Sequence, residues 1–142
     1  MGLAGLGIVL DSSVVVAAER VGKNPRKMIE ERAAAWDDTE ATLSVITVIE
    51  LAHGIERANS AARRITRELF LEELLNEITV EPITAPIALR AGRLDGALRA
   101  RGVQIAQGDL LIGTTALDLG YAVLTHNVRH FRTIPGLTVL QF

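Results

Sequence analysis

Short apolar runs alternate with longer amphipathic stretches along this chain of 142 residues, a pattern typical of strands that alternate with helices. The first run, at residues 8–10, ends in Asp11, Ser12 and Ser13, so it predicts a buried strand that leads directly into a helix. Further short runs predict strands at residues 42–44, 79–82, 121–125 and 137–140. Because helices connect these strands, the sequence predicts an α/β fold with a mostly parallel sheet covered on both faces.

Helix-starting and helix-ending residues fill the intervals between the strands. Asn24 and Pro25 begin a polar helix that extends toward Trp36, and Ser60 begins a helix that ends near residue 78. A helical apolar period covers residues 45–58 and places Glu50 inside a helix. Two more helices are predicted at residues 85–101 and 110–119, each followed by a glycine. The chain has no repeat and no long linker, so residues 1–142 are expected to form a single domain.

Composition narrows the classes of function. The chain has no cysteine, which excludes disulfides, zinc–thiolate sites and cysteine nucleophiles, and a cytoplasmic location is expected. No stretch approaches the roughly 20 apolar residues that cross a bilayer, so no membrane association is expected.

The formal net charge of −2 gives no overall attraction to nucleic acid, so any contact with a polynucleotide must use local basic clusters. These clusters lie at residues 20–27, 63–67, 90–101 and 129–132. The cluster at residues 63–67 precedes several glutamates and is interpreted as a helix face with internal salt bridges.

Four side chains with oxygen donors occupy positions that would meet at one edge of such a sheet. Asp11 and Asn127 follow predicted strands, and Asp109 stands at the start of the helix that leads into the strand ahead of Asn127. Glu50 adds a charge to an apolar helix. Ligands of open α/β sheets bind outside the carboxyl ends of the strands. Three carboxylates gathered there would repel one another unless a hard divalent cation such as Mg²⁺ or Mn²⁺ bound among them.

Each of these acids also has a purely structural interpretation. Asp11 and Asp109 fit helix N-caps, and Glu50 fits the solvent face of its helix. Spacing along the sequence does not establish that the residues meet in space. Residue chemistry alone therefore leaves both interpretations open.

Four motifs follow one another along the chain. The first is the strand at residues 8–10 with its Asp-Ser-Ser sequence, and the second is Thr-Val-Ile-Glu-Leu-Ala-His-Gly at residues 47–54. The third is Gly-Asp-Leu-Leu-Ile-Gly-Thr-Thr-Ala at residues 108–116, and the fourth is Leu-Thr-His-Asn-Val-Arg-His-Phe at residues 124–131. These ordered motifs closely resemble those of VapC-type PIN domains, the toxins of bacterial VapBC toxin–antitoxin pairs, and the resemblance covers essentially the whole chain.

This resemblance implies a PIN-like three-layer α/β/α domain that acts as a metal-dependent endoribonuclease. It implies hydrolysis of an RNA phosphodiester by water activated at a Mg²⁺ or Mn²⁺ site, leaving a 5′-phosphate and a 3′-hydroxyl. It also implies a VapB-type antitoxin that inserts a basic side chain among the acids, and a homodimer. The catalytic and metal-binding residues that the resemblance implies are Asp11, Glu50, Asp109 and, as a fourth position, Asn127, with Ser13 and Thr125 as supporting hydroxyls.

Two residues depart from the commonest form of the fourth motif. Asn127 is neutral where many members carry aspartate, and His130 replaces the usual aspartate before the closing phenylalanine. The neutral Asn127 favours one alternative, a catalytically weakened module that binds RNA or a protein partner without cleavage. His126 and His130 have the spacing of a helical zinc pair, but they follow a strand in a predicted turn and lack a third soft ligand. Either histidine, or Arg129, is instead a candidate for contact with RNA phosphate.

Overall fold

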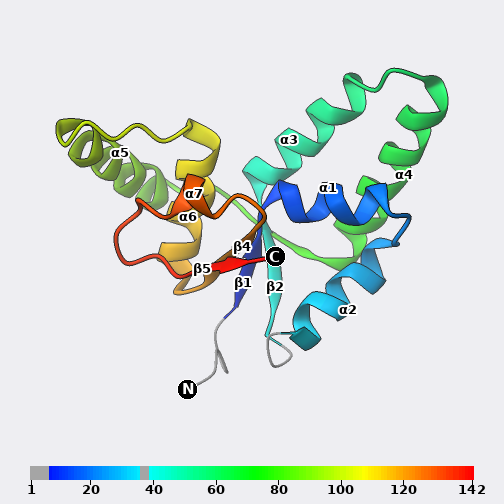
Figure 1. The fold of residues 1–142 in the computed structure, drawn as a ribbon, viewed down its shortest axis with the longest axis horizontal. Helices are drawn as coiled ribbons and strands as arrows, with labels where there is room; N and C mark the ends of the chain where they lie inside the picture. Colours follow the sequence, from blue (N-terminus) through cyan, green and yellow to red (C-terminus); the bar gives the residue numbers. More distant parts are fainter. Residues whose placement is uncertain (1–6, 36–38) are drawn as a thin grey trace.

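The computed structural model describes residues 7–35 and 39–142, in which strands and helices alternate as the sequence predicts (Figure 1). The strands of this part are β1 Ile8–Leu10, β2 Ala41–Ser44, β3 Thr79–Glu81, β4 Ala122–Thr125 and β5 Val139–Gln141. Its helices are α1 Ser12–Arg20, α2 Pro25–Ala35, α3 Val45–Glu56, α4 Ala61–Glu77, α5 Ala85–Ala100, α6 Gln107–Leu119 and α7 Val128–Phe131. The predicted end of the second helix at Trp36 lies outside the described residues. No helix in the described residues has the length and apolar character needed to cross a membrane.

The described strands form one sheet in the order β3-β2-β1-β4-β5, and every neighbouring pair is parallel. The chain moves from β1 to β2 and β3 on one side, and then to β4 and β5 on the other side. Leu10 of β1 pairs with Leu124 of β4. Just beyond this pair lies the topological switch point, where open α/β sheets bind ligands. The predicted fold class is confirmed.

Successive side chains of β1 point to opposite faces of the sheet, and each face has its own apolar core. Ile8 and Leu10 are fully buried against side chains of α1, α2 and α4. Val9 is fully buried against side chains of α5, α6 and α7. Figure 1 shows these two groups of helices on opposite sides of the sheet. The result is the three-layer α/β/α arrangement, and it fixes where the strand ends lie.

Two local features near the site differ from the predictions. Gln107, Gly108 and Asp109 open α6 as predicted, but Ala106 takes the N-cap position that Asp109 was expected to fit, and Asp109 lies within the first turn. Residues beyond β4 were predicted as a turn, yet they form the short helix α7. Phe131 of α7 is fully buried in the second core and anchors this helix to the sheet.

The prediction that arginines of the helix at residues 60–78 pair with glutamates of the same helix is wrong. Arg64 Nη2 lies 2.7 Å from Glu56 Oε2 of α3, and Arg67 donates a hydrogen bond of 2.7 Å to the Gly54 carbonyl oxygen. The basic cluster therefore holds α4 against α3 instead of pairing with later glutamates of α4. These two helices extend beyond the sheet in Figure 1.

Candidate active site at the carboxyl edge of the sheet

Asp11 lies at the switch point, directly after β1. Its backbone N–H donates a hydrogen bond of 3.0 Å to the Leu124 carbonyl oxygen of β4. Asp11 stands at the N-cap position of α1, but its side chain makes no capping hydrogen bond. Instead its Oδ2 accepts hydrogen bonds from Ser13 Oγ at 2.7 Å and from Thr125 Oγ1 at 2.9 Å. Asp11 is only 4% exposed, so the structural interpretation of this residue as a helix cap is wrong.

The two hydroxyls that bind Asp11 also bind the loop after β4. Ser13 Oγ and Thr125 Oγ1 lie 3.3 Å apart. The His126 backbone N–H donates to Ser13 Oγ at 3.1 Å, and the Asn127 backbone N–H donates to Thr125 Oγ1 at 2.8 Å. This network joins the ends of β1 and β4 and holds the carboxylate of Asp11 in one orientation.

Glu50 reaches the same edge from α3. The Ser44 side chain caps this helix by accepting from the Ile46 N–H at 3.1 Å, which sets where α3 begins. Although the Glu50 side chain is exposed overall, its carboxylate lies against the start of α6, since a methyl group built on Gly108 would be 3.3 Å from Glu50 Oε2. Burial raises the pKa of Glu50, and the charges of Asp11 and Asp109 raise it further, whereas a hydrogen bond from Ser12 lowers it.

Asp109 lies in the first turn of α6, where the helix dipole favours a negative charge. Its side chain is 18% exposed, and its Oδ2 lies 3.2 Å from His130 Nδ1 of α7. Burial raises the pKa of Asp109, and the charge of Asp11 raises it further, whereas His130 lowers it. Asp11, Glu50 and Asp109 therefore come from three different elements into one electrostatic neighbourhood.

Asn127 occupies the N-cap position of α7, and its exposed side chain makes no capping hydrogen bond. The residue is held beside the Asp11 network through its backbone, and it lines a hollow together with residues of α7. The sequence did not predict the contact between His130 and Asp109. Its only signal was that residue 130 takes the place of an aspartate in the fourth motif.

The donor set of this site fits a hard divalent cation. The charge of Asp11 raises the pKa of both Glu50 and Asp109, and the charge of Asp109 also raises that of Glu50, so a positive charge among them would be stabilised. Within the described residues, no three acidic or histidine side chains stand close enough to hold an ion alone. Mg²⁺ suits such a site, because proteins hold it through one or two carboxylates while water and substrate phosphate complete its shell.

Known proteins share this fold and these motifs. Residues 8–137 match the PIN domain. Ribonuclease VapC1 of Rickettsia felis is 32% identical over 135 residues, which cover 95% of this chain and 96% of that protein. Ribonuclease VapC10 of Mycobacterium tuberculosis is 32% identical over 124 residues, which cover 87% of this chain and 85% of that protein.

Solved structures share this fold. The crystal structure of VapBC2 from Rickettsia felis bound to a promoter DNA fragment matches with a TM-score of 0.81 at 21% identity, covering 96% of this chain and 99% of that one. VapBC-1 from nontypeable Haemophilus influenzae matches with a TM-score of 0.77 at 26% identity, covering 96% of this chain and 98% of that one. The chain belongs to the PIN-domain family and, within it, to the VapC type.

Proposed function

We propose that this chain is a metal-dependent endoribonuclease, the toxin of a toxin–antitoxin pair, and that it acts in the cytoplasm as a single domain. The observation that carries the proposal is the meeting of three carboxylates at the switch point of the sheet. One of them, Asp11, is fixed by buried hydroxyls, and the other two have raised pKa values. The name ribonuclease, which the VapC relatives carry, supports RNA as the substrate.

The proposed mechanism assigns a distinct task to each part of the site. Asp11, Glu50 and Asp109 would supply the carboxylates that hold Mg²⁺ or Mn²⁺ together with water and substrate phosphate, and Asn127 would be the fourth position. When bound, such an ion activates water for in-line attack on the phosphodiester and stabilises the leaving oxygen. Because the hydroxyls that bind Asp11 both use Oδ2, its Oδ1 is left for the ion. The expected products carry a 5′-phosphate and a 3′-hydroxyl.

Metal binding can be tested separately from cleavage. A ligand that binds only the folded chain raises its melting temperature. We therefore expect Mg²⁺ and Mn²⁺ to raise the melting temperature of the protein, and Asp11→Asn to weaken that increase. If calorimetry detects no divalent binding at millimolar metal, the metal-dependent mechanism loses its support.

The decisive test of the reaction is cleavage of RNA with mapped ends. Total RNA incubated with the purified protein and Mg²⁺ should yield fragments with 5′-phosphate ends, and Asp109→Asn should yield none. The neutral Asn127 favours a second function, a weakened module that binds RNA or a protein partner without cutting. If RNA is bound but remains intact with Mg²⁺ present, this second function replaces the first.

We also infer a VapB-type antitoxin as partner, since the similar solved structures are VapBC complexes. A hollow of about 190 Å³ between α1, α3 and α4 reaches Glu50, and Glu19, Arg20 and Arg67 also line it. A basic side chain inserted beside Glu50 would be attracted by its carboxylate. Other apolar side chains of α3 and α4 are exposed to solvent, with Ile49 60%, Ile65 58% and Leu69 61% exposed. Such exposure is typical of protein-binding surfaces.

A pull-down after co-expression with the adjacent reading frame tests this partner. The wild-type chain should capture the antitoxin, and Ile65→Asp combined with Leu69→Asp should reduce capture. A chain that captures no product of a neighbouring frame would contradict the inference. Homodimerisation through apolar helix faces is also expected, and light scattering of the purified protein measures it.

A further inference from the structure

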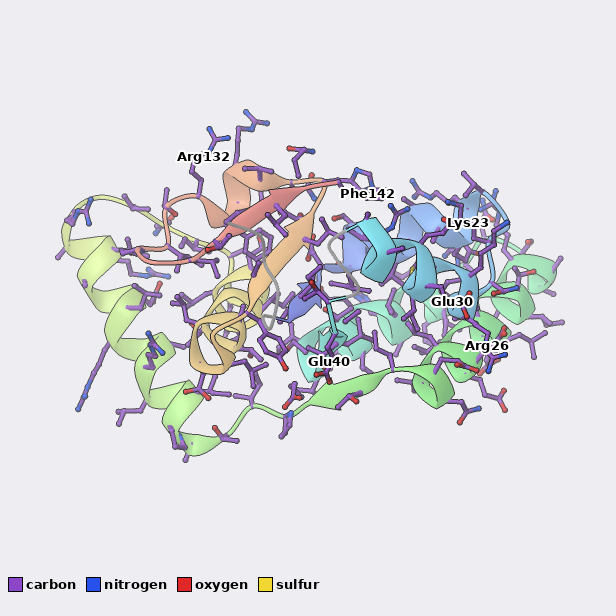
Figure 2. The ribbon with its side chains drawn as sticks, turned by 90° about the horizontal axis from the view of Figure 1, so that it is seen from below. Lys23, Arg26, Glu30, Glu40, Arg132 and Phe142 are labelled. Atoms are coloured by element: carbon purple, nitrogen blue, oxygen red, sulfur yellow. The ribbon has the colours of Figure 1, made fainter. Side chains whose placement is uncertain are left out.

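The last 24 residues of the chain carry positive but no negative side chains, unlike the rest of the sequence. Residues 119–142 contain two arginines and two histidines but no aspartate or glutamate, whereas the whole chain has a formal net charge of −2. Arg129 and Arg132 are exposed, and within the described residues neither side chain makes a hydrogen bond or an ion pair. Figure 2 shows Arg132 extending outward from the ribbon. These two guanidinium groups are therefore available to an anion from outside the chain.

Two hollows flank α7 and share Arg129 and His130 as lining residues. The first, of about 210 Å³, is lined by Asn127, Arg132 and Gln141 in addition, and most of its wall is polar. The second, of about 290 Å³, is lined by Asp109 in addition. The first hollow, named here the α7 pocket, therefore lies next to one that opens on the candidate active site. A strand bound at the acids can continue past Arg129 into the α7 pocket.

The network that orients Asp11 also fixes the wall of the α7 pocket. The backbone N–H groups of His126 and Asn127 are held by Ser13 and Thr125, at 3.1 Å and 2.8 Å. On the far side, Gln141 Nε2 donates to the His126 carbonyl oxygen at 3.4 Å. An anion in this pocket would consequently lie at a fixed position relative to the carboxylate of Asp11.

The His126 ring is held as well. It meets the Phe142 ring edge-on with 4.3 Å between centroids, and the Arg32 guanidinium lies 3.5 Å above the Phe142 centroid. His126 remains exposed despite these contacts. Unpaired RNA bases stack on exposed rings of this kind, so the surroundings of the pocket suit a nucleotide better than an acidic peptide.

We propose that the α7 pocket binds a phosphate of the RNA strand adjacent to the phosphate that is cleaved, with Arg129 and Arg132 as its cationic contacts. This inference rests on the proposed ribonuclease function. Three carboxylates at the site repel an RNA backbone, and the overall charge gives no compensating attraction. Guanidinium groups match the geometry of phosphate oxygens and supply local attraction. The amide of Asn127 adds a neutral hydrogen-bond donor to the same wall.

The test measures RNA binding without cleavage. A fluorescein-labelled single-stranded oligouridylate is titrated with the full chain in EDTA at several salt concentrations, and anisotropy gives the dissociation constant. The variants are Arg129→Gln, Arg132→Gln and the double variant. Arg63→Gln is the matched control, because Arg63 is an exposed arginine of α4 on the opposite side of the sheet from α7 (Figure 1). Thermal unfolding checks that each variant remains folded.

The proposal predicts a specific change in salt dependence. Each phosphate contact to single-stranded RNA contributes about 0.7 to the slope of log affinity against log salt. The double variant should bind on the order of tenfold more weakly and lose about 0.7 or more of that slope, while Arg63→Gln should change affinity less than about twofold. An unchanged slope in the double variant, or an equal effect of Arg63→Gln, overturns the proposal. The absence of RNA binding by the wild-type chain in EDTA at low salt also overturns it.

Cleavage assays with Mg²⁺ separate this proposal from the ribonuclease function. If wild-type protein cuts RNA and the double variant binds oligouridylate normally, the pocket is refuted and the function stands. If wild-type protein cuts no RNA but the double variant loses binding and slope, the pocket stands and the function is refuted. If the double variant loses only antitoxin capture in a pull-down, the pocket binds an acidic protein segment and the proposal is overturned.

Discussion

Replacing Thr125 with valine tests whether buried hydroxyls hold the carboxylate of Asp11 in place. Valine lacks the hydroxyl, so the change removes the hydrogen bond of 2.9 Å to Asp11 Oδ2 and deprives the Asn127 N–H of its acceptor at 2.8 Å. Thr125 is fully buried. A hydrogen bond to a charged group contributes about 1.5–3 kcal/mol, and a neutral one about 1 kcal/mol. Because Ser13 still donates to Asp11, we expect the free energy of unfolding to fall by about 2–4 kcal/mol.

Urea unfolding in the presence of a chelator measures this loss, and two other buried threonines serve as controls. Thr115 Oγ1 donates only to the Leu111 carbonyl oxygen of its own helix, at 2.8 Å, so Thr115→Val should cost under about 1 kcal/mol. Thr47 Oγ1 is buried without a hydrogen-bond partner among the described residues. Thr47→Val should therefore leave stability unchanged or raise it, because no hydrogen bond is lost.

Thr125→Ser separates the hydroxyl from the methyl group, since it keeps the first and removes the second. It should retain most of the stability that Thr125→Val loses. The dependence of the unfolding free energy on urea should stay the same in all variants, because a changed slope would report a different compactness of the chain. If Thr125→Val and Thr115→Val unfold at the same urea concentration, the network does not hold Asp11 as described.

The remaining predictions concern charge in the site. Asn127→Asp adds a carboxylate, so half-maximal cleavage should need less Mg²⁺, whereas Asn127→Ala should reduce cleavage less than Asp11→Asn because the carboxylates remain. Magnesium titrations of the cleavage rate check both, and an equal or higher requirement in Asn127→Asp would place residue 127 away from the ion. Burial is the main cause of the raised pKa values of Glu50 and Asp109. The stability that their protonated forms contribute is therefore fully present below the ordinary pKa values of 4.5 and 3.8. It is lost as pH rises through the raised values. In chelator, Asp109→Asn should therefore flatten the fall in melting temperature between about pH 4 and pH 7, and parallel curves for wild type and variant would contradict this.

The sequence predicts the positions of the site because they follow from strand ends. Asp11 and Asn127 come after β1 and β4, and parallel strands bring such positions to one edge. The helical period around Glu50 was also sufficient to place that residue inside α3. The sequence could not show that the Asp11 side chain leaves α1 uncapped, because that depends on the Thr125 hydroxyl, which is 114 residues away along the chain.

Contacts between elements that are remote in sequence account for the errors. The Arg64 side chain has glutamates within reach on its own helix, yet it pairs with Glu56 because α3 packs against α4. The short helix α7 exists because Phe131 is drawn into the core beneath it. That helix brings His130 to Asp109. None of these contacts leaves a pattern among neighbouring residues in the sequence, so hydrophobic periodicity and helix-capping residues cannot predict them.

The three carboxylates differ in how the surrounding residues stabilise them. Asp11 is held by Ser13 and Thr125 before any ion arrives, while Glu50 and Asp109 keep raised pKa values that Ser12 and His130 only partly offset. Burial is the main cause of these two raised pKa values, and the charges of the neighbouring acids add repulsion to it. A divalent ion relieves this repulsion, and so does a basic side chain inserted beside Glu50 by a partner. The two would bind the same negative charge, so each weakens binding of the other. Inhibition by such a partner thus needs no change in the conformation of the chain.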